Sequence, residues 1–180
     1  MDLVEIHHRS GPILEVGCGT GRTHEALTRR LVLRPRGYVG IDVTPAMVER
    51  ARARYPEADL REGDALELPF AGDAFGAVVC TDVLQHLPEI DRPIAEMLRV
   101  AREHVFLLLR LRKADAPRER PALVPVEVPE LGVRTSLYQL ARSDEEVIAA
   151  CRRAGGKVLD FQVVDGAGDD AGLVRVGVRR

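Results

Sequence analysis

Aromatic residues, cysteines and long apolar runs are scarce in this sequence, and each scarcity removes a class of function. Aromatic residues make up only 4% of the 180 residues, too few to form a stacking platform from which a substrate could be guessed. No apolar run approaches the roughly 20 residues of a membrane span. The three scattered cysteines, Cys18, Cys80 and Cys151, fit neither a disulfide framework nor a metal spacing, so we expect a reducing compartment and no metal.

Charge is balanced as well. The net charge is −2, so no bulk basic field favours nucleic acid as a partner. Lys113 and Lys157 are the only lysines among 26 basic residues, which indicates a high-GC genome, and we expect a bacterial source. The opening "MDLVEIHHRSG" lacks the apolar region of a secretory signal. We therefore expect a cytoplasmic protein without a membrane partner.

Short apolar runs alternate with helical patterns along the chain, and this alternation predicts a mostly parallel sheet with helices on both faces. Thr44 and Asp91 are placed to cap two helices, and Ser143 with Glu146 has the spacing of a capping box. The last two strands resemble an antiparallel hairpin. Strands are expected at 12–16, 37–42, 58–64, 75–82, 104–112, 157–164 and 172–180, and helices at 22–33, 44–55, 91–102 and 143–155.

The segment 113–135 is the least regular part of the chain. Its prolines forbid a helix, and its alternating valines favour an extended arm. Loops of this length in a compact domain are usually functional or mobile. We expect a lid over the ligand side of the sheet, with Tyr138 and Gln139 near its base; a disordered linker is the alternative.

The stretch "ILEVGCGTGR" (13–22) ends an apolar run in the glycines Gly17, Gly19 and Gly21. Glycines allow a sharp turn and expose bare backbone to a ligand, and the following helix presents free N–H groups to a carboxylate or another anion. The spacing fits neither the dinucleotide fingerprint nor the P-loop. Glu15, just before the loop, would suit a ligand that carries an ammonium group. The structural alternative is a loop that only closes a strand–helix turn.

Two further acidic residues follow predicted strands. Asp42 follows the second strand, where a carboxylate can accept hydrogen bonds from both ribose hydroxyls, and Asp64 follows the third, where it could accept from an adenine amino group. A ligand with a carboxylate, an ammonium, a ribose and an adenine is S-adenosylmethionine. As alternatives, Asp42 could be only a neighbour of the Thr44 cap, and Asp64 only a turn former.

Four motifs in order, "ILEVGCGTGR", "GIDVTPAMVERAR", "EGDALELPF" and "FGAVVCTDVLQHL", resemble those of class I S-adenosylmethionine-dependent methyltransferases of the small-molecule type. The resemblance runs from about Pro12 to Leu111. It implies a single domain over 1–180 with a Rossmann-like three-layer α/β sandwich. It also implies a seven-stranded sheet in the order 3-2-1-4-5-7-6, with strand 7 antiparallel, and S-adenosylmethionine as the cofactor.

The resemblance also implies roles for individual residues. Glu15 and the glycine loop would hold the methionyl part, Asp42 and Val43 the ribose, and Asp64 with Ala65 the adenine edge. Met47 either contacts the adenine or belongs to the core. The full set implied at the cofactor is Glu15, Gly17, Cys18, Gly19, Gly21, Asp42, Val43, Met47, Asp64, Ala65, Thr81 and Asp82.

His86, in "VLQHL", would face the exit of the methyl group. An imidazole there could act as the general base for a hydroxyl or amine acceptor; alternatively, His86 packs against or caps the following helix. "CTDVLQ" stands where a methyltransferase of bases or of protein glutamine would have an Asn/Asp-Pro-Pro-Tyr type motif. We therefore expect a small-molecule acceptor, such as a metabolite or natural product.

One departure from the family pattern affects this hypothesis. The first strand begins about a dozen residues into the chain, so the helices that usually cover the cofactor are nearly absent. Either the site is open, a partner or the second subunit of a homodimer closes it, or the chain is a piece of a longer one. An auxiliary methyltransferase-like subunit that needs a partner therefore remains an alternative. So does an enzyme that binds S-adenosylmethionine without transferring its methyl group.

Overall fold

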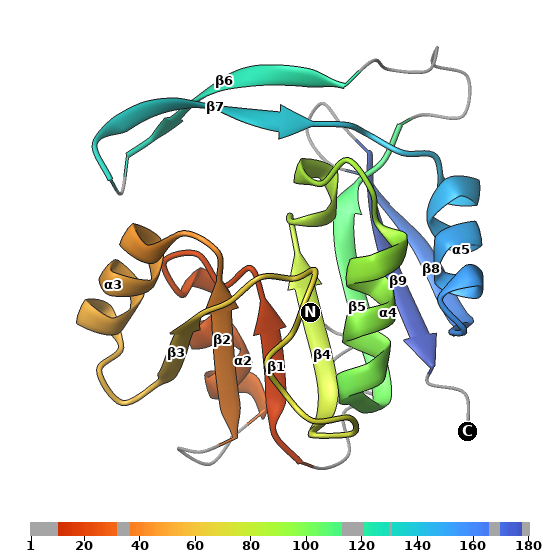
Figure 1. Cartoon of the computed structure of the whole chain (residues 1–180), viewed down its shortest axis with the longest axis horizontal. Helices are drawn as coiled ribbons and strands as arrows, with labels where there is room; N and C mark the ends of the chain where they lie inside the picture. The colour runs from red at the N-terminus through yellow and green to blue at the C-terminus, as the bar shows by residue number, and fades with distance from the viewer. Residues whose placement is uncertain (1–10, 32–36, 113–120, 130, 166–169, 178–180) are drawn as a thin grey trace.

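The structure, a computed structural model, describes residues 11–31, 37–112, 121–129, 131–165 and 170–177. Its described part contains one seven-stranded sheet and a separate two-stranded sheet (Figure 1). In chain order the elements are β1 (Ile13–Val16), α2 (Arg22–Leu31), β2 (Tyr38–Asp42), α3 (Pro45–Arg54), β3 (Asp59–Glu62), β4 (Phe75–Thr81), the 3-10 helix η1 (Leu84–His86), α4 (Asp91–Val100), β5 (Ala101–Arg110), β6 (Ala122–Val128), β7 (Val133–Gln139), α5 (Asp144–Arg153), β8 (Lys157–Asp165) and β9 (Asp170–Gly177).

The strands of the large sheet lie in the order β3-β2-β1-β4-β5-β9-β8. Strands β3, β2, β1, β4 and β5 are mutually parallel, while β9 is antiparallel to both β5 and β8. This is the order that the family resemblance implied, with β9 in the place of strand 7. The carboxyl ends of β1, β2 and β4 therefore meet at one edge of the sheet, where open α/β sheets bind their ligands.

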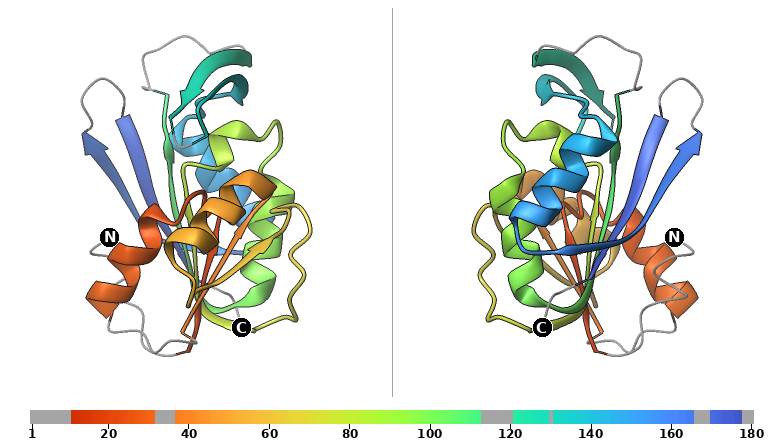
Figure 2. Two further views of the ribbon diagram at one scale, coloured as in Figure 1. Left: turned by 90° about the vertical axis from the view of Figure 1, so that its left-hand side faces the viewer. Right: turned by 90° about the vertical axis from the view of Figure 1, so that its right-hand side faces the viewer.

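Helices cover both faces of the sheet. On one face, Leu27 of α2 and Val48 of α3 join a buried cluster with Ile13 of β1. On the other face, Met97 of α4 and Val147 of α5 join a second cluster. Figure 2 shows α2 and α4 on opposite sides of the sheet. Burial on both faces explains why β1 and β4 are almost entirely apolar. Within the described ranges, every helix is too short or too polar to cross a bilayer.

Two predicted boundaries between α4 and β5 were wrong. The helix ends at Val100 and the strand begins at Ala101, without a connecting turn. Ala101 is fully buried and pairs with Phe75, so strand pairing replaces the next helical turn. The predicted cap was also wrong, because Ile90 occupies the N-cap position and Asp91 is the first helical residue. The backbone N–H of Arg92 donates instead to Glu89 Oε1 at 2.8 Å.

The irregular segment forms a second, two-stranded sheet. Strands β6 and β7 pair antiparallel from Ala122↔Gln139 to Val128↔Val133, in a hairpin whose turn includes Gly132 with a φ of 64°. Pro125 is tolerated because each strand of a two-stranded sheet is an edge strand, which can spare one backbone donor. Figure 1 shows the hairpin lying across the carboxyl ends of the central strands and reaching toward α3. The extended conformation was predicted, but the pairing was not.

Candidate functional site

A cavity of about 880 Å³ lies at the carboxyl edge of the parallel strands, with the β6–β7 hairpin on its far side. This volume is near the upper end of the range for small-ligand pockets. The residues that line it are Val16, Gly17, Cys18, Gly19, Thr20, Arg22, Thr23, Asp42, Val43, Thr44, Met47, Gly63, Asp64, Ala65, Thr81, Asp82, Val83, His86, Leu87, Val128, Leu131, Val133, Thr135, Ser136, Leu137 and Tyr138.

The glycine loop after β1 presents backbone to this cavity. The backbone N–H groups of Gly17 and Cys18 both donate to the Ile41 carbonyl, at 2.8 and 2.9 Å, which ties the loop to β2. Gly17 has a φ of 80°, and a Cβ there would overlap the Val83 side chain. At Gly19, with a φ of 52°, a Cβ would meet nothing within 4 Å. The space beside Gly19 thus fits the close approach of a ligand to bare backbone.

Asp42 connects the glycine loop to the start of α3. Its Oδ2 accepts from the backbone N–H of Gly19 and its Oδ1 from the backbone N–H of Thr44, both at 2.9 Å. The carboxylate therefore does cap the turn at Thr44, as the structural alternative required, and it also lines the cavity. A carboxylate at this strand end retains lone pairs that can accept from hydroxyl groups of a ligand.

Three of the other predicted residues combine a local role with a place in the cavity wall. Asp64 Oδ1 accepts from the backbone N–H of Leu66 at 2.9 Å, so Asp64 is a turn former that also lines the cavity. Met47 is half-buried and faces the cavity, whereas its neighbour Val48 is fully buried in the core. Asp82 adopts a φ of 57°, a left-handed conformation that directs the chain sharply away from β4.

His86 lies on η1, the short turn that follows this bend. Its Nδ1 is 2.8 Å from the backbone carbonyl oxygen of Tyr138, at the end of β7. Because a carbonyl only accepts, Nδ1 carries the proton in this contact, and Nε2 of the neutral ring keeps its lone pair. His86 therefore does not cap the following helix. It lines the cavity, and its contact with Tyr138 ties η1 to β7.

The segment after β7 is fastened to η1 by further hydrogen bonds. Leu140 donates its backbone N–H to the Gln85 carbonyl at 2.9 Å. The buried guanidinium of Arg142 donates to the carbonyls of Leu84, Leu87 and Pro88, at 3.0, 2.7 and 3.1 Å. These bonds fix the turn that carries His86 to the base of the hairpin. The sequence analysis did not identify Arg142, because its partners are backbone atoms more than 50 positions away.

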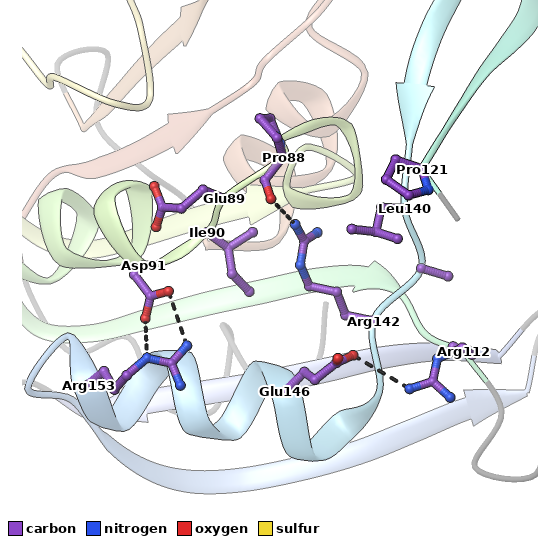
Figure 3. Close-up of a pocket in the computed structure, with 11 residues that line it drawn as sticks. Pro88, Glu89, Ile90, Asp91, Arg112, Pro121, Leu140, Arg142, Glu146 and Arg153 are labelled. Atoms are coloured by element: carbon purple, nitrogen blue, oxygen red, sulfur yellow. Dashed lines mark hydrogen bonds and ion pairs between the residues drawn. The ribbon is translucent and has the colours of Figure 1, made fainter. Parts of the chain in front are cut away.

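Arg142 also lines a second cavity, of about 370 Å³, between the start of α4 and the start of α5 (Figure 3). Four of the charged residues on its wall form two pairs, while Glu89 and Arg142 bond to backbone groups. Arg153 forms two hydrogen bonds with the Asp91 carboxylate, at 2.7 and 3.1 Å, and Arg112 lies 3.6 Å from Glu146. The pairing of these charges indicates a structural role for this polar cavity.

Two of the predicted cofactor residues, Glu15 and Gly21, do not line the large cavity. A Cβ at Gly21 would lie 2.8 Å from the Tyr55 ring, so this glycine serves the packing of the loop. Glu15 is 1% exposed and accepts a hydrogen bond from the Tyr38 hydroxyl. Burial raises the pKa of Glu15 to about 7, against the lowering effect of hydrogen bonds from Tyr38 and Thr23. Thr23 lines the cavity, so Glu15 adjoins the cavity wall through that side chain.

Cys18 faces the cavity as an unreactive thiol. Burial, together with the charges of Glu15 and Asp42, raises its pKa to about 12. A thiol with such a pKa is a poor nucleophile at neutral pH. Across the described residues, no three His, Cys, Asp or Glu side chains gather as a metal site would require.

The sequence analysis expected a lid over the ligand side of the sheet with Tyr138 near its base, but it did not name the other hairpin residues of the cavity wall. Among them, Val128 and Val133 come from the segment 113–135 and Leu137 from just beyond it. Their alternation of apolar and polar residues was a signal for strands, and Gly132 was a signal for a turn. Together these features could have predicted the pairing of the two strands in a hairpin.

Comparison with known proteins shows what the chain is similar to. The family model described as "Methyltransferase domain" matches residues 14–109. A phosphatidylethanolamine N-methyltransferase of Cereibacter sphaeroides is 35% identical over 104 residues, which cover 54% of this chain and 49% of the relative. A protein of Mycolicibacterium smegmatis named "Probable S-adenosylmethionine-dependent methyltransferase" is 31% identical over 153 residues, 82% of this chain and 58% of the relative.

A solved structure supports the same fold. The crystal structure of the [4+2]-cyclase SpnF superposes with a TM-score of 0.77 at 20% identity, over 98% of this chain and 79% of that one. At this identity the likeness concerns the fold alone. The chain spans about half the length of the curated relatives that it matches.

The buried carboxyl of Glu15 should make stability depend on pH. Its folded-state pKa of about 7 lies above the ordinary value of 4.5, so the folded protein binds this proton more tightly than the unfolded chain. The stability it contributes is full below pH 4.5 and is lost as the pH rises to about 7. Glu15→Gln should remove this loss, which amounts to about 3 kcal/mol at most.

Urea unfolding of the wild type and of Glu15→Gln between pH 4.5 and 8 measures the effect. Glu62→Gln, on the exposed end of β3, is the control and should keep the wild-type slope. Identical slopes for Glu15→Gln and the wild type would show that Glu15 titrates as an ordinary carboxyl.

Loss of the Arg142 hydrogen bonds should destabilise the protein. Arg142→Met keeps the length of the side chain but removes three charge-assisted hydrogen bonds to the carbonyls of Leu84, Leu87 and Pro88, which should cost about 2 to 4 kcal/mol in the free energy of unfolding. Arg153→Met removes an exposed ion pair with Asp91 and should leave the free energy of unfolding close to the wild-type value. Equal effects of the two substitutions in urea unfolding would contradict the role assigned to Arg142.

Proposed function

This chain belongs to the class I S-adenosylmethionine-dependent methyltransferases, and we propose that it transfers a methyl group to a small-molecule acceptor bound beneath the β6–β7 hairpin. Enzymes of this family use S-adenosylmethionine as their cofactor. The observation that carries the proposal is that the glycine loop, Asp42, His86 and the hairpin line a single cavity. The relative named for phosphatidylethanolamine lends support to a small-molecule acceptor.

The polar end of the cavity is suited to the cofactor. The backbone around Gly19 and the start of α2 would hold the methionyl part, the Asp42 carboxylate the ribose hydroxyls, and Asp64 with Met47 the adenine. This assignment is supported by the open space beside Gly19 and by the place of the Asp42 carboxylate in the cavity wall. When bound, S-adenosylmethionine supplies a methyl group already activated on a sulfonium.

His86 is proposed as the general base for the acceptor. With the Nδ1 proton held by the Tyr138 carbonyl, Nε2 can take the proton from an acceptor hydroxyl or amine and store it until product leaves. The contact also limits rotation of the ring, because a rotated imidazole would lose its hydrogen bond. Proton removal by a positioned base typically contributes about 10²- to 10⁴-fold in rate.

The hairpin is proposed as the lid of the site. Apart from the segment that fastens β7 to η1, its residues belong to neither buried cluster among the described residues. It could therefore open without disrupting the core. A cover supplied by the same chain would allow one domain to enclose the cofactor and acceptor without a second subunit.

Removal of the Asp42 carboxylate should abolish cofactor binding. Calorimetric titration of the wild type should give micromolar binding of S-adenosylmethionine and S-adenosylhomocysteine and no binding of NAD. Asp42→Ala should lose this binding, because the substitution removes the carboxylate that would accept hydrogen bonds from the ribose hydroxyls. It also removes the hydrogen bond from the backbone N–H of Gly19. Asp59→Ala, which breaks an exposed pair with Arg61, should bind as the wild type does. A folded wild type that binds neither ligand would favour an auxiliary subunit.

Replacement of His86 should slow turnover without weakening cofactor binding. His86→Ala should reduce the release of S-adenosylhomocysteine, measured with a panel of alcohols, phenols and amines, by about 100-fold or more. Affinity for S-adenosylhomocysteine, measured on the same preparations, should change little. Undiminished turnover in His86→Ala would eliminate His86 as the base and leave the family assignment intact.

A further inference from the structure

The two faces of the β6–β7 hairpin differ in chemistry. Directly paired residues of an antiparallel ladder lie on the same face of the sheet. By the observed register, one face carries the pairs Ala122↔Gln139, Val124↔Leu137, Val126↔Thr135 and Val128↔Val133, and the other carries Leu123↔Tyr138, Pro125↔Ser136 and Glu127↔Arg134. The first set is aliphatic apart from Thr135 and, at the base of the hairpin, Gln139. The second includes an ion pair between exposed Arg134 and Glu127 side chains, 3.9 Å apart.

The aliphatic face is turned toward the cavity. Val128, Val133, Thr135 and Leu137 of this face line it, and Val133 is still 45% exposed. Ser136 and Tyr138 of the other face reach the cavity as well, but Val124, Val126 and Val128 are each more buried than their neighbours in β6. In the described part of the chain, none of the hairpin side chains is counted in a buried apolar cluster. An aliphatic strand face that borders a cavity gains from burial only when an apolar molecule fills the space.

The wall opposite the hairpin is also apolar at this end. Val83 and Leu87 pack against the large core cluster and line the cavity beside η1. Arg22 is the only arginine or lysine among the described lining residues, and it begins α2 at the glycine-loop end. Among the residues that the structure describes, a phosphate or carboxylate on the acceptor would therefore find no arginine or lysine beneath the hairpin.

We propose that the acceptor is a molecule without an anionic group, with an elongated apolar body and a single reacting hydroxyl or amine. The body would lie between the aliphatic face of the hairpin and the side chains of Val83 and Leu87, with the reacting group toward His86. This inference rests on the proposed function, since it names the class of acceptor for the same site. A free aliphatic metabolite and an uncharged lipid drawn from a membrane share this chemistry.

Binding of a neutral apolar probe tests the subsite before the acceptor is known. N-phenyl-1-naphthylamine should gain fluorescence on binding to the protein saturated with S-adenosylhomocysteine, and 1-dodecanol should displace it, whereas dodecyl phosphate should displace it poorly. Leu137→Gln should lower the affinity of the protein for the probe about tenfold. Leu123→Gln, at a leucine 72% exposed on the other face, should leave its affinity unchanged. Circular dichroism of each variant checks that it is folded.

A second displacement experiment distinguishes a dissolved acceptor from one drawn from a membrane. 1-Dodecanol supplied in phosphatidylcholine vesicles should displace the probe as the free alcohol does if the protein draws its acceptor from a membrane. Displacement by the free alcohol alone would assign a dissolved acceptor. Either result supports the apolar subsite.

Three results would overturn the inference. In the first, Leu137→Gln and Leu123→Gln lower the affinity for the probe equally. In the second, dodecyl phosphate displaces the probe more strongly than 1-dodecanol does. In the third, the protein does not bind the probe. Calorimetry with S-adenosylhomocysteine on the same preparations distinguishes the failures. If the protein binds that ligand but not the probe, only the apolar subsite is wrong; if it binds neither, the proposed function fails as well.

Discussion

The hydrogen bonds between the end of the hairpin and the turn η1 are the constraint on which the enclosed cavity depends. They join Tyr138, Leu140 and Arg142 to carbonyl and imidazole groups between Leu84 and Pro88. Without them the hairpin would have little to hold it over the sheet, because its own side chains lie outside the buried clusters. The same bonds orient His86, so the cover and the proposed base are positioned together.

This arrangement divides the cavity into two chemically different ends. At the end formed by the glycine loop, backbone groups and the carboxylates of Asp42 and Asp64 face the space. At the end beneath the hairpin, valine and leucine side chains face it instead. The carboxyl ends of parallel strands make the first end, since they bring polar turns to one edge. A meeting of two apolar surfaces far apart in the chain makes the second.

Most of the sheet and of the polar end could be predicted because their signals are local. The glycine spacing, the acidic residues after the second and third strands and the alternation of strands with helices each lie within short stretches. Together they indicated the fold, and all the predicted cofactor residues except Glu15 and Gly21 line the cavity. Glu15 could not be placed in advance, because its partner Tyr38 is 23 positions away on the neighbouring strand. Their contact depends on the sheet's register.

By itself, the sequence determined which segments are strands and helices, the sharp turn at the glycine loop and the family to which the chain belongs. Hydrophobic periodicity and backbone preferences act over a few residues and can be read directly. Only the tertiary structure decided that the valine-rich segment pairs as a hairpin, turns its aliphatic face to the cavity and is tied to His86 through Tyr138. Those contacts join residues about 50 positions apart, and the chain must fold before the distance between them is defined.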